Sequence, residues 1–215
     1  VIAESVTRQS VIMSETASEY ADISRLAELL PGGEKMPEKT AYESSLPRRM
    51  GIEVPAAVSF AVTAYDMASD GRRMSGAMSV GANIISLAHL WNAIRVQGGS
   101  YGASMAASRT GNLICYTYRD PSPARSLDVY KTIPEFLDAF ASADDAGIDG
   151  FIISTVAQTE PLLSPAAKGR AGDDFCMSGY SDEDRANIRR EMLNTKAGDL
   201  AGLHDALADM TEKST

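Results

Sequence analysis

An arginine and a tyrosine lie six residues apart on either side of a glycine pair. In the stretch LWNAIRVQGGSYG, Arg95 ends a helix-like run, Gly98 and Gly99 follow, and Tyr101 opens a run of small residues. Because glycine ends helices and lets the chain fold back, the guanidinium and the phenol hydroxyl could converge at one end of the helix. Together they could hold peptide carbonyls or stabilise a tetrahedral oxyanion. Both groups would act only as donors, so a nucleophile would have to come from elsewhere.

The same two residues also have an ordinary structural interpretation. A cation in the last turn of a helix is favoured by the helix dipole, and tyrosine is a common strand residue. Residue types alone favour this interpretation over a chemical role.

A zinc site within this chain is not expected. In HLWNA, His89 is followed by Asn92 and Ala93 where the inverted zinc motif H-x-x-E-H has its glutamate and second histidine. Asparagine cannot act as a general base and alanine cannot bind a metal. His89 is expected on a helix surface or in a satisfied core position, and His204, the other histidine, on a helix surface.

Other catalytic patterns are missing from the sequence as well. No G-x-S-x-G segment is present, and spacing suggests no cysteine–histidine pair. The glycine-rich GGSYG follows a helix and opens a strand, whereas a dinucleotide loop follows a strand and opens a helix. We therefore expect no catalytic residue and no cofactor in this chain.

Composition limits the partners and the compartment. The 215 residues carry a net charge of −9, which argues against nucleic-acid binding, and no apolar run is long enough to cross a membrane. Two distant cysteines, Cys115 and Cys176, favour a reducing compartment, so we expect the cytoplasm. The chain begins at Val1 without a signal segment, and we expect it to be a piece of a longer chain.

The elements that must position Arg95 and Tyr101 follow from hydrophobic periodicity and from helix and turn signals. The long helix has an expected apolar stripe of Ile84, Leu87, Trp91 and Ile94, and its small residues near the start would let another backbone approach. Ser122, Ser164 and the SDED run at 181–184 are expected helix caps. The predicted strands are 2–14, 56–66, 100–108 and 112–119; the predicted helices are 18–33, 74–96, 123–142, 146–158, 164–177, 181–194 and 196–211; and 31–55 is predicted to be an extended arm.

This order of elements predicts an α+β fold. Strands 100–108 and 112–119 read as a hairpin joined by SRTGN, and the later helices would stack on one face of a mainly antiparallel sheet. We expect residues 1–215 to form a single domain.

The segment from Leu90 to Tyr130 resembles the C-terminal domain of insulinase-type, or pitrilysin-superfamily, zinc metallopeptidases. The nearest branch is the presequence protease and falcilysin group, where the run reads L-W-x-x-[IV]-R-V-Q-G-G-A-Y-G and a strand ends in Y-R-D-P. Ser100 replaces the alanine here. Residues 53–62, 162–169 and 180–195 are also similar, so the resemblance spans about residues 50–210.

The resemblance implies the fold of the LuxS and mitochondrial-processing-peptidase-like domains and a place as the last of four related domains. Zinc and its H-x-x-E-H motif would lie in the first domain, and the chain alone would be inactive. The resemblance further implies that Arg95 and Tyr101, with Gly98 and Gly99 between them, contact the bound peptide. Implied partners are the N-terminal half of the same enzyme and unfolded peptides held in a closed chamber, and a homodimer of the isolated domain stays open.

Two alternatives belong to other functional classes. One is an inactive scaffolding subunit of the same superfamily, which would tolerate loss of Arg95 or Tyr101. The other is a stand-alone peptide-binding module, which would bind peptides without a partner half.

Overall fold

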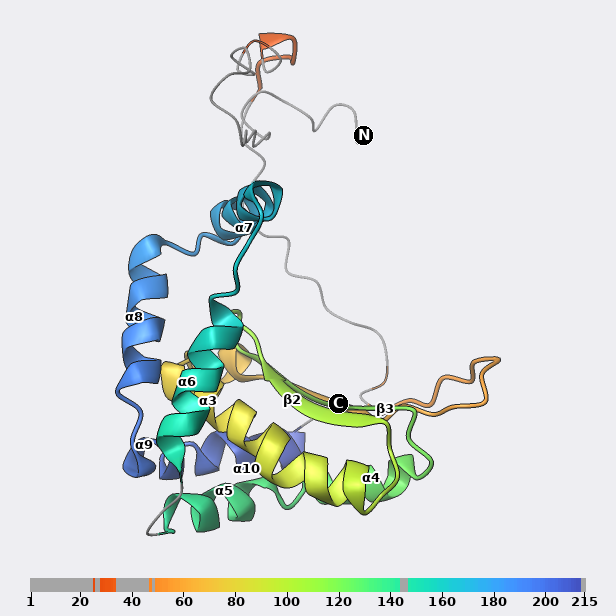
Figure 1. The fold of residues 1–215 in the computed structure, drawn as a ribbon. Coiled ribbons are helices and arrows are strands. Elements are labelled where there is room, and N and C mark those ends of the chain that lie inside the picture. The colour runs from red at the N-terminus through yellow and green to blue at the C-terminus, as the bar shows by residue number, and fades with distance from the viewer. Residues whose placement is uncertain (1–24, 26–27, 34–46, 48, 144–146, 214–215) are drawn as a thin grey trace. The chain divides into compact units, whose positions relative to one another are not determined.

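The computed structural model describes residues 25, 28–33, 47, 49–143 and 147–213 (Figure 1). Contacts divide the chain into two compact units, Val1–Leu46 with Pro161–Asp184 and Pro47–Glu160 with Arg185–Thr215. The second unit contains the sheet, Arg95 and Tyr101. That residues 1–215 act as one domain stays a prediction.

The described strands form one antiparallel sheet, as predicted (Figure 1). Their order in the sheet is β1-β3-β2. Register pairs Tyr65 with Leu113 and Met105 with Cys115. Gly111, with φ +90°, turns the chain between the two hairpin strands. The bounds are β1 (Val62–Asp66), β2 (Gly102–Ala107) and β3 (Asn112–Tyr118).

The first strand is shorter than predicted. Residues 56–61 lie outside β1, apart from a single bridge between Ser59 and Asp120. Ala61 still lies opposite β3, and the Thr117 amide donates to the Ala61 carbonyl at 2.8 Å. The Ala61 amide, however, donates to the Thr117 side-chain hydroxyl at 2.8 Å, which interrupts the regular pairing. Beyond this point β3 ends at Tyr118 and Arg119 turns with φ +51°.

Helices cover one face of this sheet, which confirms the α+β prediction. Side chains alternate along the strands, so that Thr63, Tyr65, Met105, Leu113 and Cys115 are buried. The opposite face leaves Phe60, Val62, Tyr116 and Tyr118 exposed. The unit also contains the short 3₁₀ helix η2 (Met67–Asp70) and most of α8 (Asp182–Leu193). Its other helices are α3 (Gly76–Ile84), α4 (Pro123–Tyr130), α5 (Ile133–Ala141), α6 (Ile148–Thr159), α9 (Ala197–Ala201) and α10 (His204–Lys213).

The long predicted helix is present but changes its winding. Ser75 caps α3 by accepting a hydrogen bond from the Met78 amide at 3.1 Å, and α3 continues into the π-helix η3 (Ile85–Val96). The Gln97 amide donates to the Asn92 carbonyl at 3.0 Å, a bond between residues five apart. A π-helix has more residues in each turn than an α-helix.

This winding overturns part of the predicted apolar stripe. Ile84 and Ile94 are buried, but Leu87 is 50% exposed and Trp91 is 42% exposed. The buried residues Ile85, Leu90 and Ile94 are spaced five and four residues apart, in line with the wider turn. The stripe was placed with α-helical spacing, so it failed where the helix becomes π.

The small residues at the start of α3 do allow a close approach, as predicted. A Cβ on Gly76 would lie 2.3 Å from the Met192 nitrogen and 2.6 Å from the Ile188 oxygen of α8. The Gly76 amide donates to a Glu191 carboxylate oxygen at 2.8 Å, so α8 also caps the helix that leads to Arg95.

Two predicted helices are each broken in two. The helix predicted over 123–142 divides into α4 and α5 around Lys131 and Thr132, because Pro134 in the next turn lacks a donor and restricts the residue before it. The helix predicted over 196–211 divides into α9 and α10 at Gly202, where glycine favours a break.

The first unit contributes one described helix, α7 (Pro165–Ser178), at the predicted place. Ser164 caps it, accepting from the Ala167 amide at 3.3 Å. The SDED capping box is confirmed, since Ser181 and Asp184 each accept a hydrogen bond from the other's amide at 3.1 and 3.0 Å.

Some predictions fall outside the described residues. These are the strand at 2–14, more than half of the helix at 18–33 and much of the arm at 31–55. Of the predicted helix at 18–33, the described residues 25 and 28 are helical. The described parts of the arm, 31–33, 47 and 49–55, have no helix or strand, in line with the prediction. None of the helices in the described parts of the chain has the length and apolar character needed to cross a membrane.

Candidate functional site

The structure brings Arg95 and Tyr101 together. Arg95 lies in the last turn of η3, and the next turn is closed by the Gly99 amide donating to the Arg95 carbonyl at 3.0 Å. The Tyr101 amide then donates to the Tyr118 carbonyl at 3.1 Å, which starts the pairing of the new strand. As a result, the Arg95 guanidinium carbon lies 5.9 Å from the centre of the Tyr101 ring.

Both side chains keep their donors available. Arg95 stacks on Trp91 with its guanidinium carbon 3.8 Å from the ring centre, and Tyr101 is 65% exposed with its ring edge against Tyr118. Within the described ranges neither side chain makes a hydrogen bond or an ion pair. A stacked guanidinium and a free phenol hydroxyl can therefore both donate to an incoming acceptor.

The glycines between them are required by the turn. A Cβ on Gly98 would lie 2.4 Å from the Ile94 oxygen and 2.6 Å from Arg125 Nη1. Gly99 has φ +80°, a conformation that side-chain-bearing residues rarely adopt. Their contact with a substrate stays a prediction.

A second arginine, which the sequence reasoning missed, lies beside the same tyrosine. The Arg119 guanidinium carbon is 5.8 Å from the Tyr101 ring centre and 5.4 Å from that of Tyr118. Tyr118 also packs against Phe60, with ring centres 5.6 Å apart. We call this set the arginine–aromatic cluster, whose members are Phe60, Trp91, Arg95, Tyr101, Tyr118 and Arg119.

A buried aspartate fixes the turn that carries Arg119. The Asp120 carboxylate accepts from the Ser122 amide at 2.8 Å and from the Ser126 hydroxyl at 2.6 Å, and the Asp120 amide donates to Ser59. Burial alone would raise the pKa of Asp120, but these hydrogen bonds outweigh it and hold that pKa below its usual value. Ser122 stands at the predicted cap position, yet its side chain makes no capping bond, because Asp120 binds the start of α4 instead.

Neither histidine is placed for metal chemistry. His89 shares a hydrogen bond with Thr132 at 2.9 Å and stacks on Phe136, and burial lowers the pKa of His89. His204 Nδ1 lies 2.6 Å from the Asp138 carboxylate. The described stretches of chain contain no group of three or more histidine, cysteine, aspartate or glutamate side chains that could hold a metal ion.

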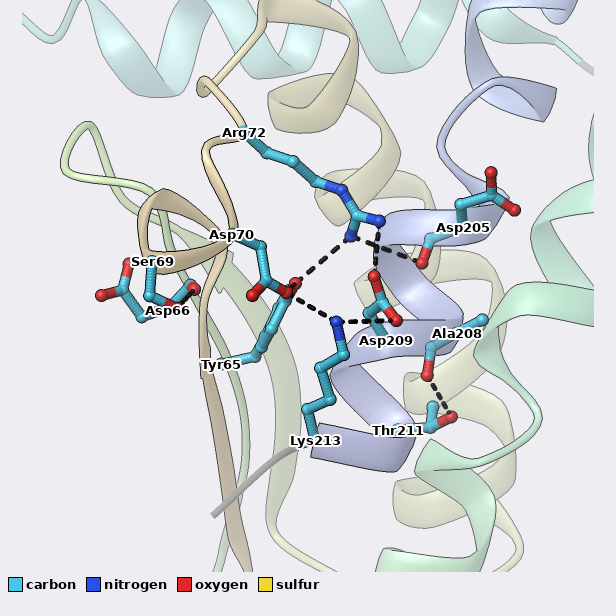
Figure 2. Close-up of polar contacts among 10 residues, drawn as sticks. All are labelled: Tyr65, Asp66, Ser69, Asp70, Arg72, Asp205, Ala208, Asp209, Thr211 and Lys213. Atoms are coloured by element: carbon cyan, nitrogen blue, oxygen red, sulfur yellow. Dashed lines mark hydrogen bonds and ion pairs between the residues drawn. The ribbon is translucent and has the colours of Figure 1, made fainter.

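A second polar group lies at the far end of the sheet, and we call it the charge cluster (Figure 2). Lys213 bridges Asp70 at 2.8 Å and Asp209 at 3.2 Å. Arg72 bridges Asp209 at 2.5 Å and donates to the Tyr65 hydroxyl, which itself donates to Asp70 at 2.5 Å. Each charged member therefore has an opposite charge beside it.

These pairs shift the pKa values of the cluster. The hydrogen bond from Lys213 holds the pKa of Asp70 below its usual value. Burial would raise the pKa of Asp209, but hydrogen bonds from Lys213 and Arg72 outweigh it and lower that pKa. A pocket of about 320 Å³ lies beside the cluster. The ion pairs nevertheless join Asp70 and Arg72 to α10, and the Tyr65 hydroxyl of β1 hydrogen-bonds to the same two residues. The cluster therefore indicates a structural attachment of α10 to the sheet.

Comparison with known proteins agrees with the resemblance stated above. A family model described as the PreP C-terminal domain matches residues 51–215. "Protein HypA" of Clostridium perfringens is 28% identical over 177 residues, 82% of this chain and 18% of that protein. "Presequence protease 1, chloroplastic/mitochondrial" of Arabidopsis thaliana is 29% identical over 80% of this chain and 16% of its own length. "Presequence protease, mitochondrial" of Saccharomyces cerevisiae is 27% identical over 87% of this chain and 19% of its own length. The chain thus spans less than a fifth of these relatives.

Proposed function

The chain belongs to the PreP C-terminal domain family, and from this premise we propose that it is the non-catalytic last domain of a zinc metallopeptidase. The parent would degrade unfolded peptides in a closed chamber. The relatives named as presequence proteases support this reaction class.

One observation supports the role that we propose for this domain. Arg95 and Tyr101 meet at the helix–strand turn with their side-chain donors unpaired. Stacking on Trp91 holds Arg95 in place, and the backbone hydrogen bond to Tyr118 holds Tyr101. Donors placed in this way can hold a peptide carbonyl or the oxyanion that forms when the carbonyl is attacked. The pair supplies neither a base nor a nucleophile, so both would come from the partner half.

Zinc belongs to that partner half in this proposal. His89, the residue nearest in pattern to a zinc motif, is engaged with Thr132 and Phe136. When bound in the first domain, zinc would activate the attacking water. The residues of this chain would orient the peptide and stabilise developing charge.

The test is cleavage of a quenched fluorescent peptide by this chain alone, by the upstream half alone and by the two mixed. We expect no peptide cleavage by either part alone and cleavage by the mixture. The upstream coding sequence should contain H-x-x-E-H, and finding none would overturn the proposal. If the mixed halves associate and bind zinc but do not cleave the peptide, the chain would instead be part of an inactive scaffolding subunit.

Variants then test the two donors. Arg95→Lys keeps the charge but loses the planar fork that contacts two acceptors, so kcat/KM should fall. Tyr101→Phe removes one hydroxyl, and kcat should fall by on the order of 10–1000-fold. Arg190→Gln is the matched control, because the Arg190 guanidinium donates to Asn187 on its own helix. Unchanged kinetics in both site variants would leave the pair with a packing role.

Two further expectations belong with this proposal. Cys115 and Cys176 are both free, which suits the cytoplasm, and cell fractionation would test that location. The exposed sheet face could pair two copies of the isolated domain, and sedimentation would test that homodimer.

A further inference from the structure

We propose that Arg95 and Arg119 together form a binding site for a carboxylate group of the peptide substrate. The inference rests on the proposed function and deepens it by naming a chemical preference. It assigns Arg119 a role in binding that the helix–strand turn alone does not suggest.

The two arginines come from different elements and lie beside one ring. Arg95 leaves η3 and Arg119 follows β3, yet their guanidinium carbons lie 5.9 and 5.8 Å from the centre of Tyr101. Arg95 also stacks on Trp91, and Arg119 lies against Tyr118. Cations and aromatic rings therefore alternate through the arginine–aromatic cluster.

Such contacts leave the hydrogen-bonding edge of each arginine free. A guanidinium stacks through its face, whereas its N–H donors point outward in its plane. Among the described residues neither Arg95 nor Arg119 has a carboxylate partner. Other arginines of this acidic chain do have one, since Arg72 pairs with Asp209 and Arg73 with Glu191.

A third arginine lies at the edge of the same turn. Arg125 Nη1 is 2.6 Å from the place that a Cβ of Gly98 would take, and no ion pair of Arg125 occurs within the described ranges. In a chain with 29 acidic and 20 basic residues, unpaired arginines around one turn make a local positive site. An anion is the ligand that such a site attracts.

The backbone conformation of Arg119 also supports a binding role for this residue. Its φ of +51° is the only positive value at a non-glycine residue in the described part of the chain. A β-carbon makes this conformation unfavourable, and glycine would serve the turn better. The buried bonds of Asp120 hold the strained turn in place, and the Arg119 guanidinium reaches Tyr101 from it. Strain of this kind is typical of functional positions.

The proposed ligand follows from the substrate class. A peptide offers two carboxylate sources, its C-terminus and its aspartate or glutamate side chains. A carboxylate is planar and accepts two parallel hydrogen bonds from a guanidinium. Exposed Tyr101, Tyr118 and Phe60 would contact the neighbouring peptide residues.

The test uses the single tryptophan of the chain, Trp91, as the probe. Its fluorescence should respond to a ligand at Arg95, because that side chain lies on the indole. Three N-acetylated peptides of serine, glycine and alanine are compared: one with a free C-terminus, one amidated, and one amidated with an internal glutamate. The free-terminus and glutamate forms separate the two carboxylate sources.

We expect at least one carboxylate peptide to bind about tenfold tighter than the neutral peptide, and added salt to weaken that preference. Arg119→Gln should abolish the preference, and Arg190→Gln should leave it intact. Arg119→Gly suits the turn and removes the guanidinium, so it serves as a second variant if the first folds poorly.

Several results would overturn the proposal. Equal binding of the three peptides would do so, as would a preference that survives loss of Arg119. The absence of a saturable response below about 1 mM from both carboxylate peptides would also contradict it. If the mixed halves still require Arg95 and Tyr101 for cleavage, the proposed function stands and only the carboxylate site is wrong.

Discussion

The two glycines between Arg95 and Tyr101 should respond differently to the same substitution. A Cβ on Gly98 would lie 2.4 Å from the Ile94 carbonyl oxygen, so the two atoms would have to separate by roughly 0.6 Å to reach the closest contact that real Cβ atoms make. Backbone cannot yield as a side chain can, and crowding of this kind costs about 1–3 kcal/mol. Arg125, the other close neighbour, is exposed and can swing away. We therefore expect Gly98→Ala to lower the free energy of unfolding by about 2 kcal/mol.

Gly99 has room for a side chain but not the right backbone for one. The nearest heavy atom to its Cβ position is Pro121 Cγ at 3.7 Å, an ordinary contact, while φ is +80°. Gly99→Ala should thus cost about 1–2 kcal/mol through the backbone alone. Asparagine tolerates positive φ better than alanine, so Gly99→Asn should recover part of the loss. Gly98→Asn should recover nothing, because its Cβ meets the same oxygen.

Urea unfolding followed by Trp91 fluorescence and by circular dichroism measures all four variants. The informative quantity is the difference between asparagine and alanine at each position, which should be positive at Gly99 and near zero at Gly98. A Gly98→Ala variant within about 0.5 kcal/mol of the parent would refute the crowding argument. An asparagine gain at Gly98 as large as that at Gly99 would refute the separation of the two causes.

Three further predictions concern the scaffold. The aspartates of the charge cluster have lowered folded-state pKa values, so their contribution to stability is present above the unfolded pKa of about 4 and is lost as pH falls through the lower folded values. Lys213→Met should accordingly destabilise the chain at neutral pH, and its difference from the parent in thermal unfolding should shrink as the pH falls below about 4. A difference that stays constant with pH would contradict the linkage. Burial raises the pKa of the Cys115 thiol to about 12, so a maleimide should label exposed Cys176 quickly and Cys115 only on unfolding; equal rates in the folded chain would sink this idea. Gly76→Ala should cost about 2–3 kcal/mol in urea unfolding, because its Cβ would meet the α8 backbone at 2.3 Å, and a stabilised variant would show that α8 moves aside freely.

Much of the fold could be predicted because local signals agreed with the global arrangement. The hairpin, the α3 start and the Ser164 cap each depend on residues close in sequence. The failures have longer-range causes. The strand before Val62 is cut short where the Ala61 amide bonds to the Thr117 side chain of β3, and a proline four residues downstream divides α4 from α5.

The site was predicted only in part for a similar reason. Arg95 and Tyr101 are neighbours along the chain, so a helix stop between them was enough to bring them together. Arg119 reaches Tyr101 only because it follows the strand paired with Tyr101 and adopts a positive φ. Residue types do not specify that conformation for an arginine. The one available signal was R-D-P at a strand end, where the proline restricts the aspartate and a turn must follow.

Because η3 is a π-helix, the direction in which the Arg95 side chain leaves it depends on the number of residues that precede Arg95 in the helix. Each residue of an α-helix turns the chain by about 100°, so deleting one residue between Ile85 and Trp91 would rotate everything after it by roughly that angle or restore ordinary α-helical winding. Leu87 and Trp91 could then join the buried stripe that α-helical spacing assigned to them, and Arg95 would leave the ring of Tyr101. A chain shortened by one residue at this place would keep every side chain of the arginine–aromatic cluster while losing their arrangement.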